Sequence, residues 1–401
     1  MIEIDFDRPI NRTHGDSEKW NEYGPGVLPM WVADMDFKSP EPVIRALEER
    51  VAHGVFGYGS PPHDLQEIIA DRMKRLYAWE VAPEAIVLLP GVITGFNIAC
   101  RAFTRPGDGL FIQTPVYPPI LHVHENHQLV SQQNELVREP NGTYSIDLDA
   151  FEDGIQPNTR MFLLCNPHNP VGRAFRRDEL EEMARISLRH DLVICSDEIH
   201  SDLVFSGHRH TPIASLDPEI ARATITLMAP SKTFNIAGLD CSYAIIPDED
   251  LRRRFQATRR GIAGDVNILG LAAARAAYLE GEAWLSSLIS YLEGNRDILV
   301  STLRSELPDI QVCPPDATYL AWLDCRELGL GRPACEFFLQ EAKVAVNDGA
   351  SFGKSGAGFV RFNFGCPRDQ VNLALQKMKQ AVEEARSGGQ NAKPPAGGLA
   401  G

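Results

Sequence analysis

Two charged side chains in this sequence stand where they could do covalent and acid–base chemistry. Lys232 follows the apolar run 224–228, and Asp197 follows the apolar run 192–196. A lysine is normally solvated, but one that is desolvated in a cleft has a lowered pKa and forms Schiff bases with carbonyl compounds. Burying a carboxylate without a partner is costly, so Asp197 predicts a cationic group opposite it.

Four further residues occupy similar places, and each has a plain structural interpretation beside a chemical one. Arg361 lies within the apolar run 359–364, where its guanidinium favours a planar anion, either a ligand carboxylate or a structural acid. Asn169 belongs to the second of two Asn-Pro pairs, which predict a rigid turn that either presents this side chain to a ligand or is only a turn. Tyr117 could stack on a planar ring or pack on the surface. Gly91 opens a helix whose N–H groups could hold a phosphate, or is only a turn glycine.

A buried sheet is needed to bring these residues together. Apolar runs alternate with helix-like stretches and are apolar on both faces, which predicts parallel strands with helices on either side. Because ligands gather at the carboxyl ends of strands in such sheets, the candidate side chains should meet at one edge. The predicted strands are 86–89, 109–113, 161–165, 192–196, 224–228 and 242–246.

A second, smaller α/β unit follows the large one. A helical run over 249–307 precedes shorter strands at 319–323 and 359–364, which alternate with helices that begin near 333 and 368. The C-terminal end is rich in Gly, Pro and Ala and cannot form a core. The expected organisation is an N-terminal arm that contributes to the small domain over 1–40, a large cofactor-binding domain over 41–285, a small domain over 286–386, and a disordered tail over 387–401.

Composition excludes several classes of protein. With 401 residues, 44% of them hydrophobic, the chain is long enough for two cores and is neither disordered nor fibrous. A formal net charge of −15 makes nucleic acid and anionic membranes poor partners. We expect no membrane span and a cytoplasmic location, because no long apolar run or basic leader occurs. The eight cysteines form no Cys-x-x-Cys pair, and His122, His124 and His127 lie near no cysteine, so no metal is predicted.

Taken together and in this order, the residues resemble the fold type I pyridoxal-phosphate (PLP) enzymes of the aspartate aminotransferase superfamily. Within it the sequence is most similar to the cystathionine β-lyase and cysteine-S-conjugate β-lyase branch, which includes the maltose-regulon modulator protein. The resemblance implies a large domain with a mostly parallel sheet of the seven-stranded type flanked by helices, and a smaller α/β domain. The segments that carry it are 28–37, 56–58, 166–172, 196–203, 231–239, 317–324 and 361–368.

The same resemblance implies PLP as cofactor and a role for each candidate. Lys232 would carry the cofactor as a Schiff base and move the Cα proton, and Asp197 would pair with the pyridine nitrogen. Arg361 would clamp the α-carboxylate of the substrate. The other cofactor contacts that it implies are Gly91, the N–H groups of Val92 and Ile93, the ring of Tyr117, Asn169 at the ring 3-oxygen, His200 and Ser231, and the other substrate contacts are Ala33 and Asn169.

Family members are dimers, and the resemblance therefore implies a homodimer with shared active sites in which Tyr58 reaches the partner's phosphate. Two positions depart from the aminotransferase pattern. His200 stands where those enzymes have a tyrosine, as in the lyase branch, and Asp240 stands where many have a phosphate-binding arginine. Either Asp240 points away from the phosphate, or the phosphate depends more on the helix, Ser231 and Tyr58.

Three functions remain open at this stage. The lyase-branch segments favour a β-elimination that converts cystathionine or a related S-substituted L-cysteine into pyruvate, ammonia and a thiol. The alternative is transamination of amino acids, and a PLP-binding regulatory protein is a third interpretation. The sequence favours the lyase, because the segment around His200 and residues 31–37 resemble the lyase branch, and it does not specify the preferred thioether.

Overall fold

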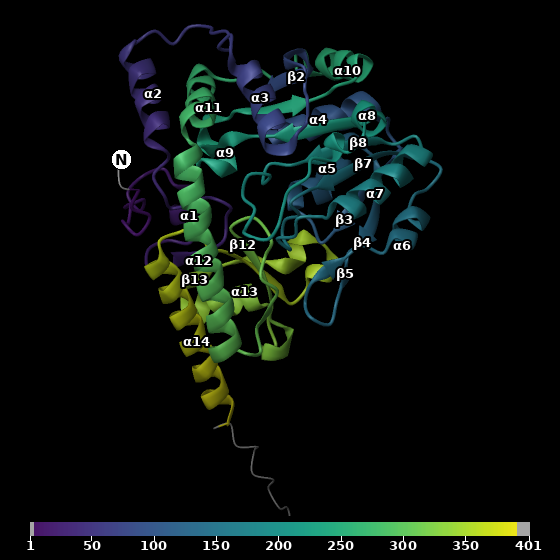
Figure 1. The fold of residues 1–401 in the computed structure, drawn as a ribbon. Helices are drawn as coiled ribbons and strands as arrows, with labels where there is room; N and C mark the ends of the chain where they lie inside the picture. The colour runs from purple at the N-terminus through teal and green to yellow at the C-terminus, as the bar shows by residue number, and fades with distance from the viewer. Residues whose placement is uncertain (1–3, 391–401) are drawn as a thin grey trace, which may run out of the picture.

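A computed structural model describes residues 4–390 of the chain. Its centre is a seven-stranded sheet in the order β2-β10-β9-β8-β7-β3-β4 (Figure 1). All six predicted strands are present, within two residues of the expected bounds. The strands are β2 (Ile86–Leu89), β3 (Gly109–Thr114), β4 (Val130–Glu135), β7 (Thr159–Cys165), β8 (Val193–Asp197), β9 (Thr224–Met228) and β10 (Ser242–Ile245).

The sheet is mostly parallel, and β10 is the exception. β10 pairs antiparallel with both β2 and β9, so the prediction that all six strands run parallel is wrong for this strand. The reason is the connection before it, which folds into the short helices α9 (Pro230–Thr233) and η3 (Ala237–Leu239) at one edge. A parallel strand needs a crossover that returns along the sheet, and this segment makes none. β4 was not predicted because nearly all of its residues are polar.

Both faces of the sheet are buried, as the apolar runs predict. On β7, Leu163 packs into one core with Phe96 of α4 (Val92–Phe103), and the next residue, Leu164, packs into another with Leu180 of α7 (Arg177–Arg189). Successive strand residues point to opposite faces, so this alternation places helices on both sides. The helices around the sheet are α2 (Glu41–Ala52), α3 (Leu65–Tyr77), α4 (Val92–Phe103), α5 (Pro118–His127), α6 (Leu148–Asp153), α7 (Arg177–Arg189), α8 (Pro218–Arg222), α10 (Glu249–Arg259) and α11 (Ile268–Glu280).

The smaller unit is built on a second sheet, in the order β11-β12-β15-β14. Its long helices α12 (Glu282–Glu306) and α14 (Arg368–Gln390) lie side by side (Figure 1). Because α14 continues to Gln390, the tail predicted over 387–401 begins too early, and 391–401 lie outside the described residues. The short strands are β5 (Val137–Arg138), β6 (Tyr144–Ser145), β11 (Gln311–Val312), β12 (Leu320–Asp324), β14 (Asn347–Asp348) and β15 (Phe359–Asn363).

The N-terminal segment joins the smaller unit before the large sheet begins. After α1 (Glu18–Asn21), β1 (Leu28–Pro29) pairs parallel with β13 (Val344–Ala345), which follows the helices α13 (Ala334–Phe337) and η5 (Phe338–Ala342) along the chain. The backbone N–H of Asn363 donates to the carbonyl of Met30 at 2.9 Å, which ties the chain beyond β1 to β15. Residues 30–37 also form hydrogen bonds with Asn235, which follows α9 of the large unit, so they pass between the two units.

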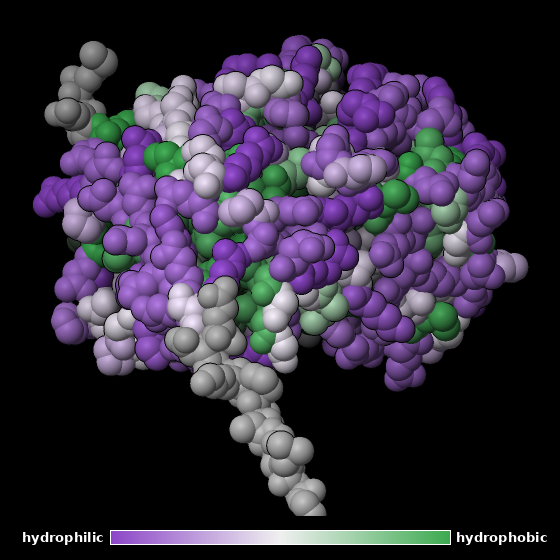
Figure 2. Space-filling view, turned by 90° about the horizontal axis from the view of Figure 1, so that it is seen from below, coloured by the Kyte–Doolittle hydropathy of each residue, from purple (hydrophilic) through white to green (hydrophobic). Residues whose placement is uncertain are grey.

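The surface agrees with the composition. Seen from below, it is mostly hydrophilic, and its apolar residues lie in separate small groups (Figure 2). Among the described helices, none is both long and apolar enough to cross a membrane.

Candidate active site

One cavity of about 460 Å³ collects most of the residues that the sequence singled out. It lies at the carboxyl ends of β2, β3, β7, β8 and β9, which is the edge where ligands gather in such sheets. The predicted residues that line it are Ala33, Gly91, Val92, Ile93, Tyr117, Asn169, Asp197, His200, Ser231 and Lys232, together with Asp240. Arg361 borders the cavity through Asn169, and Tyr58 lies elsewhere.

Lys232 reaches into this cavity from α9. Its Nζ donates to the carbonyl of Ala33 at 2.7 Å. Desolvation lowers the pKa of Lys232, and the carboxylates of Asp34 and Asp197 oppose that shift. A lysine in this setting loses its proton more readily than one in water, which is what a nucleophilic amine or a proton carrier requires.

Asp197 ends β8 with its carboxylate almost fully buried. Within the described residues, its side chain accepts a hydrogen bond from the N–H of Ile199 at 3.1 Å, and no basic side chain pairs with it. Desolvation raises the pKa of Asp197 to about 7. A cationic donor placed against it would reverse that shift, so the carboxylate is poised for a ligand that carries one.

The surroundings of Arg361 distinguish the two partners that the sequence left open, a ligand carboxylate and a structural acid. Its Nη1 donates to Oδ1 of Asn169 at 3.0 Å, and its Nη2 donates to Oδ1 of Asn347 at 2.6 Å and to the carbonyl of Trp31 at 3.1 Å. All of these acceptors are neutral, and no carboxylate of residues 4–390 forms an ion pair with this guanidinium. Desolvation lowers the pKa of Arg361 to about 10. A structural acid is thus excluded within the described chain, and an anionic ligand is favoured.

Two buried ring and guanidinium atoms also point to a ligand. Nδ1 of His200 and Nε of Arg361 are buried without a hydrogen-bond partner in the described part of the chain. Burial lowers the pKa of His200 to about 3, so its imidazole is neutral at ordinary pH. These two atoms are therefore available to a ligand or to water.

The N-terminus of α4 opens on the same cavity. Gly91 precedes the helix, and the first N–H groups, at Val92 and Ile93, have no acceptor within the helix. Because helix N-termini favour anions, this end suits a phosphate. Asp240 lines the cavity too, in a left-handed conformation after η3, and it is exposed, so water can solvate its carboxylate.

Tyr58 is not part of this cavity in the single chain. It lies in the long connection between α2 and α3 (Figure 1), and its side chain is fully exposed. Val55 and Phe56 beside it are also exposed, at 61% and 59%. An exposed apolar segment of this kind is typical of a surface that another chain covers.

Three further residues shape the site and were not predicted from the sequence. The hydroxyl of Tyr319 donates to the carbonyl of Ala33 at 2.9 Å, and the same oxygen accepts from Nζ of Lys232. Asn347 and Trp31 hold Arg361. Trp31 and Tyr319 belong to segments that carry the family resemblance, and this was the only signal in the sequence that could have found them.

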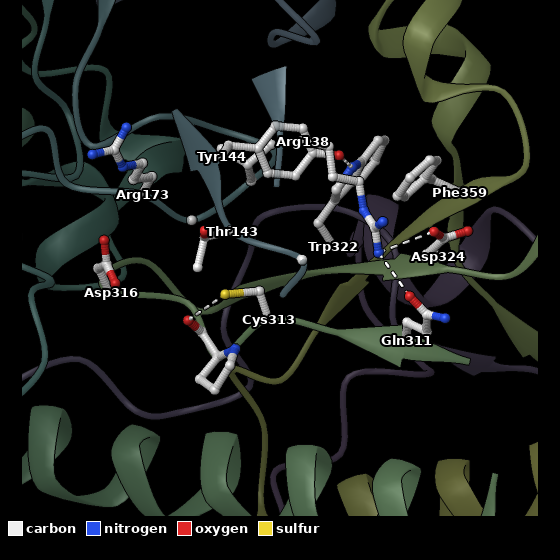
Figure 3. Close-up of a pocket in the computed structure, with 14 residues that line it drawn as sticks. Arg138, Thr143, Tyr144, Arg173, Gln311, Cys313, Asp316, Trp322, Asp324 and Phe359 are labelled. Carbon is white, nitrogen blue, oxygen red and sulfur yellow. Dashed lines mark hydrogen bonds and ion pairs between the residues drawn. The ribbon is translucent and has the colours of Figure 1, made fainter. Parts of the chain in front are cut away.

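A second, smaller pocket of about 70 Å³ lies between the β5–β6 hairpin and the small sheet (Figure 3). Its guanidinium groups are already neutralised. Arg138 contacts Asp324 at 3.2 Å, and Arg173 contacts Glu179 at 2.7 Å. Trp322 closes one wall of the pocket. We assign no ligand to it.

Known proteins share this arrangement along nearly the whole chain. Residues 26–378 match the model of the family described as aminotransferase class I and II. The chain belongs to this family. Its fold is that of the fold type I PLP transferases, as the sequence predicted.

Relatives within the family include lyases. Cystathionine beta-lyase PatB of Bacillus subtilis (strain 168) is 41% identical over 94% of this chain and 100% of its own length. The crystal structure of cystalysin from Treponema denticola, which contains a pyridoxal 5'-phosphate cofactor, has a TM-score of 0.92 at 34% identity and covers 96% of this chain and 100% of its own. The PLP-bound C-S lyase from Staphylococcus hominis has a TM-score of 0.89 at 32% identity and covers 95% and 99%.

Proposed function

We propose that this family member is a PLP-dependent carbon–sulfur β-lyase that converts cystathionine or related S-substituted L-cysteines into pyruvate, ammonia and a thiol. The observation that carries the proposal is the unneutralised Arg361 beside a cavity that also holds Lys232 and Asp197. These three groups suit the α-carboxylate of an amino acid and a cationic ring nitrogen. The lyase names of the relatives support the reaction.

The residues of the cavity fit PLP. Asp197 would accept a hydrogen bond from the pyridine nitrogen. The phosphate would accept hydrogen bonds from the backbone N–H groups of Val92 and Ile93 and from the hydroxyl of Ser231. The unpaired Nδ1 of His200 fits a polar group of the ligand. We assign Gly91, Tyr117 and Asn169 to the same cofactor. When bound, PLP supplies an electron sink at the substrate's amino group.

The protein's own residues then divide the work of the elimination. Arg361 holds the α-carboxylate and so orients the substrate, with Ala33 and Asn169 beside it. Lys232, whose pKa burial lowers, takes the proton from Cα. The electrons of the Cα–H bond form a double bond between Cα and Cβ, and those of the Cβ–S bond leave with the sulfur, which departs as a thiolate. The resulting enamine tautomerises to an imine, which water hydrolyses to pyruvate and ammonia. Asp197 would keep the pyridine nitrogen of the cofactor protonated throughout.

Transamination is the second candidate, since the family model itself is described by that activity. It uses the same proton transfer by Lys232 but needs no leaving group on Cβ. A regulatory role without chemistry has less support, because Lys232, Asp197, Asn169 and Arg361 are all retained. The cytoplasmic location stays a prediction.

We further propose a homodimer in which Tyr58 completes the partner's site. The support is its full exposure, together with the exposed Val55 and Phe56. A fully exposed side chain beside exposed apolar residues is suited to contact a second copy.

The test is an assay of pyruvate and thiol release from cystathionine and a panel of S-substituted cysteines. Alanine and aromatic amino acids with a keto-acid acceptor are assayed in parallel. Lys232→Ala is the matched control and should show no turnover, and borohydride reduction should place the cofactor on Lys232. New amino acid without any pyruvate from cystathionine would replace the lyase by the aminotransferase.

A further inference from the structure

Residues 30–37, here called the strap, lie beside the two segments that carry Arg361 and Lys232. Asn363, two residues after Arg361, donates its side-chain amide to strap carbonyls at 2.6 and 2.9 Å. Asn235, three residues after Lys232, donates to strap carbonyls at 2.9 and 2.8 Å and accepts from a strap N–H at 3.2 Å. The strap is therefore held at both ends by residues that adjoin the site.

The middle of the strap meets the reactive lysine directly. The carbonyl of Ala33 accepts from Nζ of Lys232 at 2.7 Å and from the hydroxyl of Tyr319 at 2.9 Å. A carbonyl that accepts from an ammonium group favours its charged form. The position of this one carbonyl thus affects both where Nζ lies and how readily it loses a proton.

A buried ion cluster also holds the strap, through the carboxylate of Asp36 and the carbonyl of Asp34. The carboxylate of Asp36 is 3% exposed. It accepts hydrogen bonds from Nζ of Lys19 at 2.7 Å, Nη1 of Arg12 at 2.8 Å and Nε1 of Trp20 at 2.9 Å. The side chain of Lys19 is 0% exposed and also donates to the carbonyl of Asp34 at 2.8 Å. Buried ion pairs are weak devices for stability alone, but their directional bonds can specify one conformation.

We propose that Lys19 and Asp36 are positioning residues. They hold the strap so that the carbonyl of Ala33 accepts a hydrogen bond from Nζ of Lys232. The inference rests on the proposed function, because it takes Lys232 to be the reactive amine. Neither Lys19 nor Asp36 lines the cavity, so each acts through the strap and not on the substrate.

The test is the reactivity of Lys232 in Lys19→Met, which removes both bonds of the ammonium and keeps an apolar stem. Full-length protein is freed of bound carbonyl compounds with hydroxylamine and labelled with limiting acetic anhydride across a pH series. Acetylation of Lys232 is then measured by peptide mass spectrometry. Loss of the carbonyl acceptor should lower the pKa of the amine and raise its labelling at mildly alkaline pH at least about threefold, the effect of half a pKa unit.

The matched control is Glu179→Gln, which breaks the partly buried ion pair between Glu179 on α7 and Arg173 before it, outside the strap and the cavity. It should leave the labelling profile of Lys232 unchanged. With cystathionine, Lys19→Met should lower kcat more than it changes KM, because Arg361 keeps its contacts with Asn169 and Asn347, which lie outside the strap. A wild-type labelling profile in Lys19→Met, or an equal change in Glu179→Gln, would overturn the proposal.

Trp20→Phe supplies a second variant should Lys19→Met fail to fold. It removes one donor to Asp36 from a half-buried side chain and should shift the Lys232 profile in the same direction; no shift would count against the proposal. Failure of the proposed function is distinguishable. Wild-type protein that releases no pyruvate refutes the lyase, while the labelling experiment still reports on the position of Lys232.

Discussion

At the scale of single residues, the site depends on charges that the folded chain leaves without partners. Arg361 is buried among neutral acceptors, and Asp197 is buried with one backbone donor among the described residues. Both groups are costly to bury in this state. They are therefore the residues at which substitution should reveal function most directly.

Arg361→Lys should weaken substrate binding. A lysine offers a single point charge in place of the planar guanidinium that can contact both oxygens of a carboxylate. The expected cost is about 1.5 to 3 kcal/mol, the range for hydrogen bonds to charged groups, seen as a higher KM for cystathionine. Arg173→Lys, at the paired arginine near the second pocket, is the control. An unchanged KM in Arg361→Lys would remove this residue from the site.

Asp197→Asn should change how stability depends on pH in the cofactor-free protein. The folded pKa of Asp197, about 7, is raised above its ordinary value of 3.8. The folded state therefore holds a proton that the unfolded state releases, and this contribution to stability falls as pH rises through that window. The asparagine of the variant does not titrate, so the variant does not lose stability in this way as pH rises. The difference in unfolding free energy between variant and wild type should therefore increase with pH.

Urea denaturation of both proteins across this pH range measures the difference. His200, whose folded pKa is lowered to about 3, acts in the opposite direction but is common to both proteins. The comparison thus isolates Asp197. A difference that does not vary with pH would show that the carboxylate is not desolvated in solution.

At the scale of elements, the cavity depends on the close packing of α11 against η3. A Cβ added at Gly270, in the first turn of α11, would lie 2.2 Å from the carbonyl oxygen of Leu239. Asn267, the residue before α11, donates its side-chain amide to the same carbonyl at 2.7 Å. Since Asp240 and Cys241 directly follow η3 and line the cavity, this contact sets the position of one wall.

Gly270→Ala should therefore destabilise the protein and weaken cofactor binding together. Overpacking of this kind costs about 1 to 3 kcal/mol. The melting temperature and the dissociation constant for PLP are the two measurements. Gly264→Ala, where an added Cβ meets nothing within 4 Å, is the control and should change neither. Normal PLP affinity in Gly270→Ala would mean that the wall tolerates the shift.

At the scale of the whole molecule, the proposed dimer predicts that a complete site needs residues from two chains. Tyr58 is exposed and stands apart from the cavity of its own chain. In a symmetric dimer the same surface meets both partners, so a residue that acts across the interface does so twice. The proposed dimer can be tested by mixing two inactive variants.

Tyr58→Ala and Lys232→Ala, each impaired alone, should recover activity when unfolded and refolded together. A hybrid dimer would carry both substitutions in one site and neither in the other. Random pairing then restores about a quarter of the wild-type sites. The control is a mixture of Lys232→Ala with Asp197→Asn, which lie in the same site of one chain and should not complement. Equal recovery in both mixtures, or none in either, would contradict the assignment of Tyr58 to the partner.

The amino-acid sequence by itself determined the large sheet and the chemistry at its edge. Runs that are apolar on both faces predicted six strands, and reactive side chains after four of them predicted where the cavity lies, because both signals are local in the chain. The resemblance to a family then supplied the cofactor. Local patterns do not encode which distant groups meet, and this is why strand direction at β10 was predicted wrongly.

Only the tertiary structure decided the partners of the charged groups. Lys232 and Ala33 are 199 residues apart in the chain, and Arg361 and Trp31 are 330 apart. The absence of an acid beside Arg361 in the described chain, and the ion cluster around Asp36, depend on how the N-terminal segment packs between the sheets. Such contacts arise from burial and geometry over the whole fold, and no spacing within the sequence specifies them.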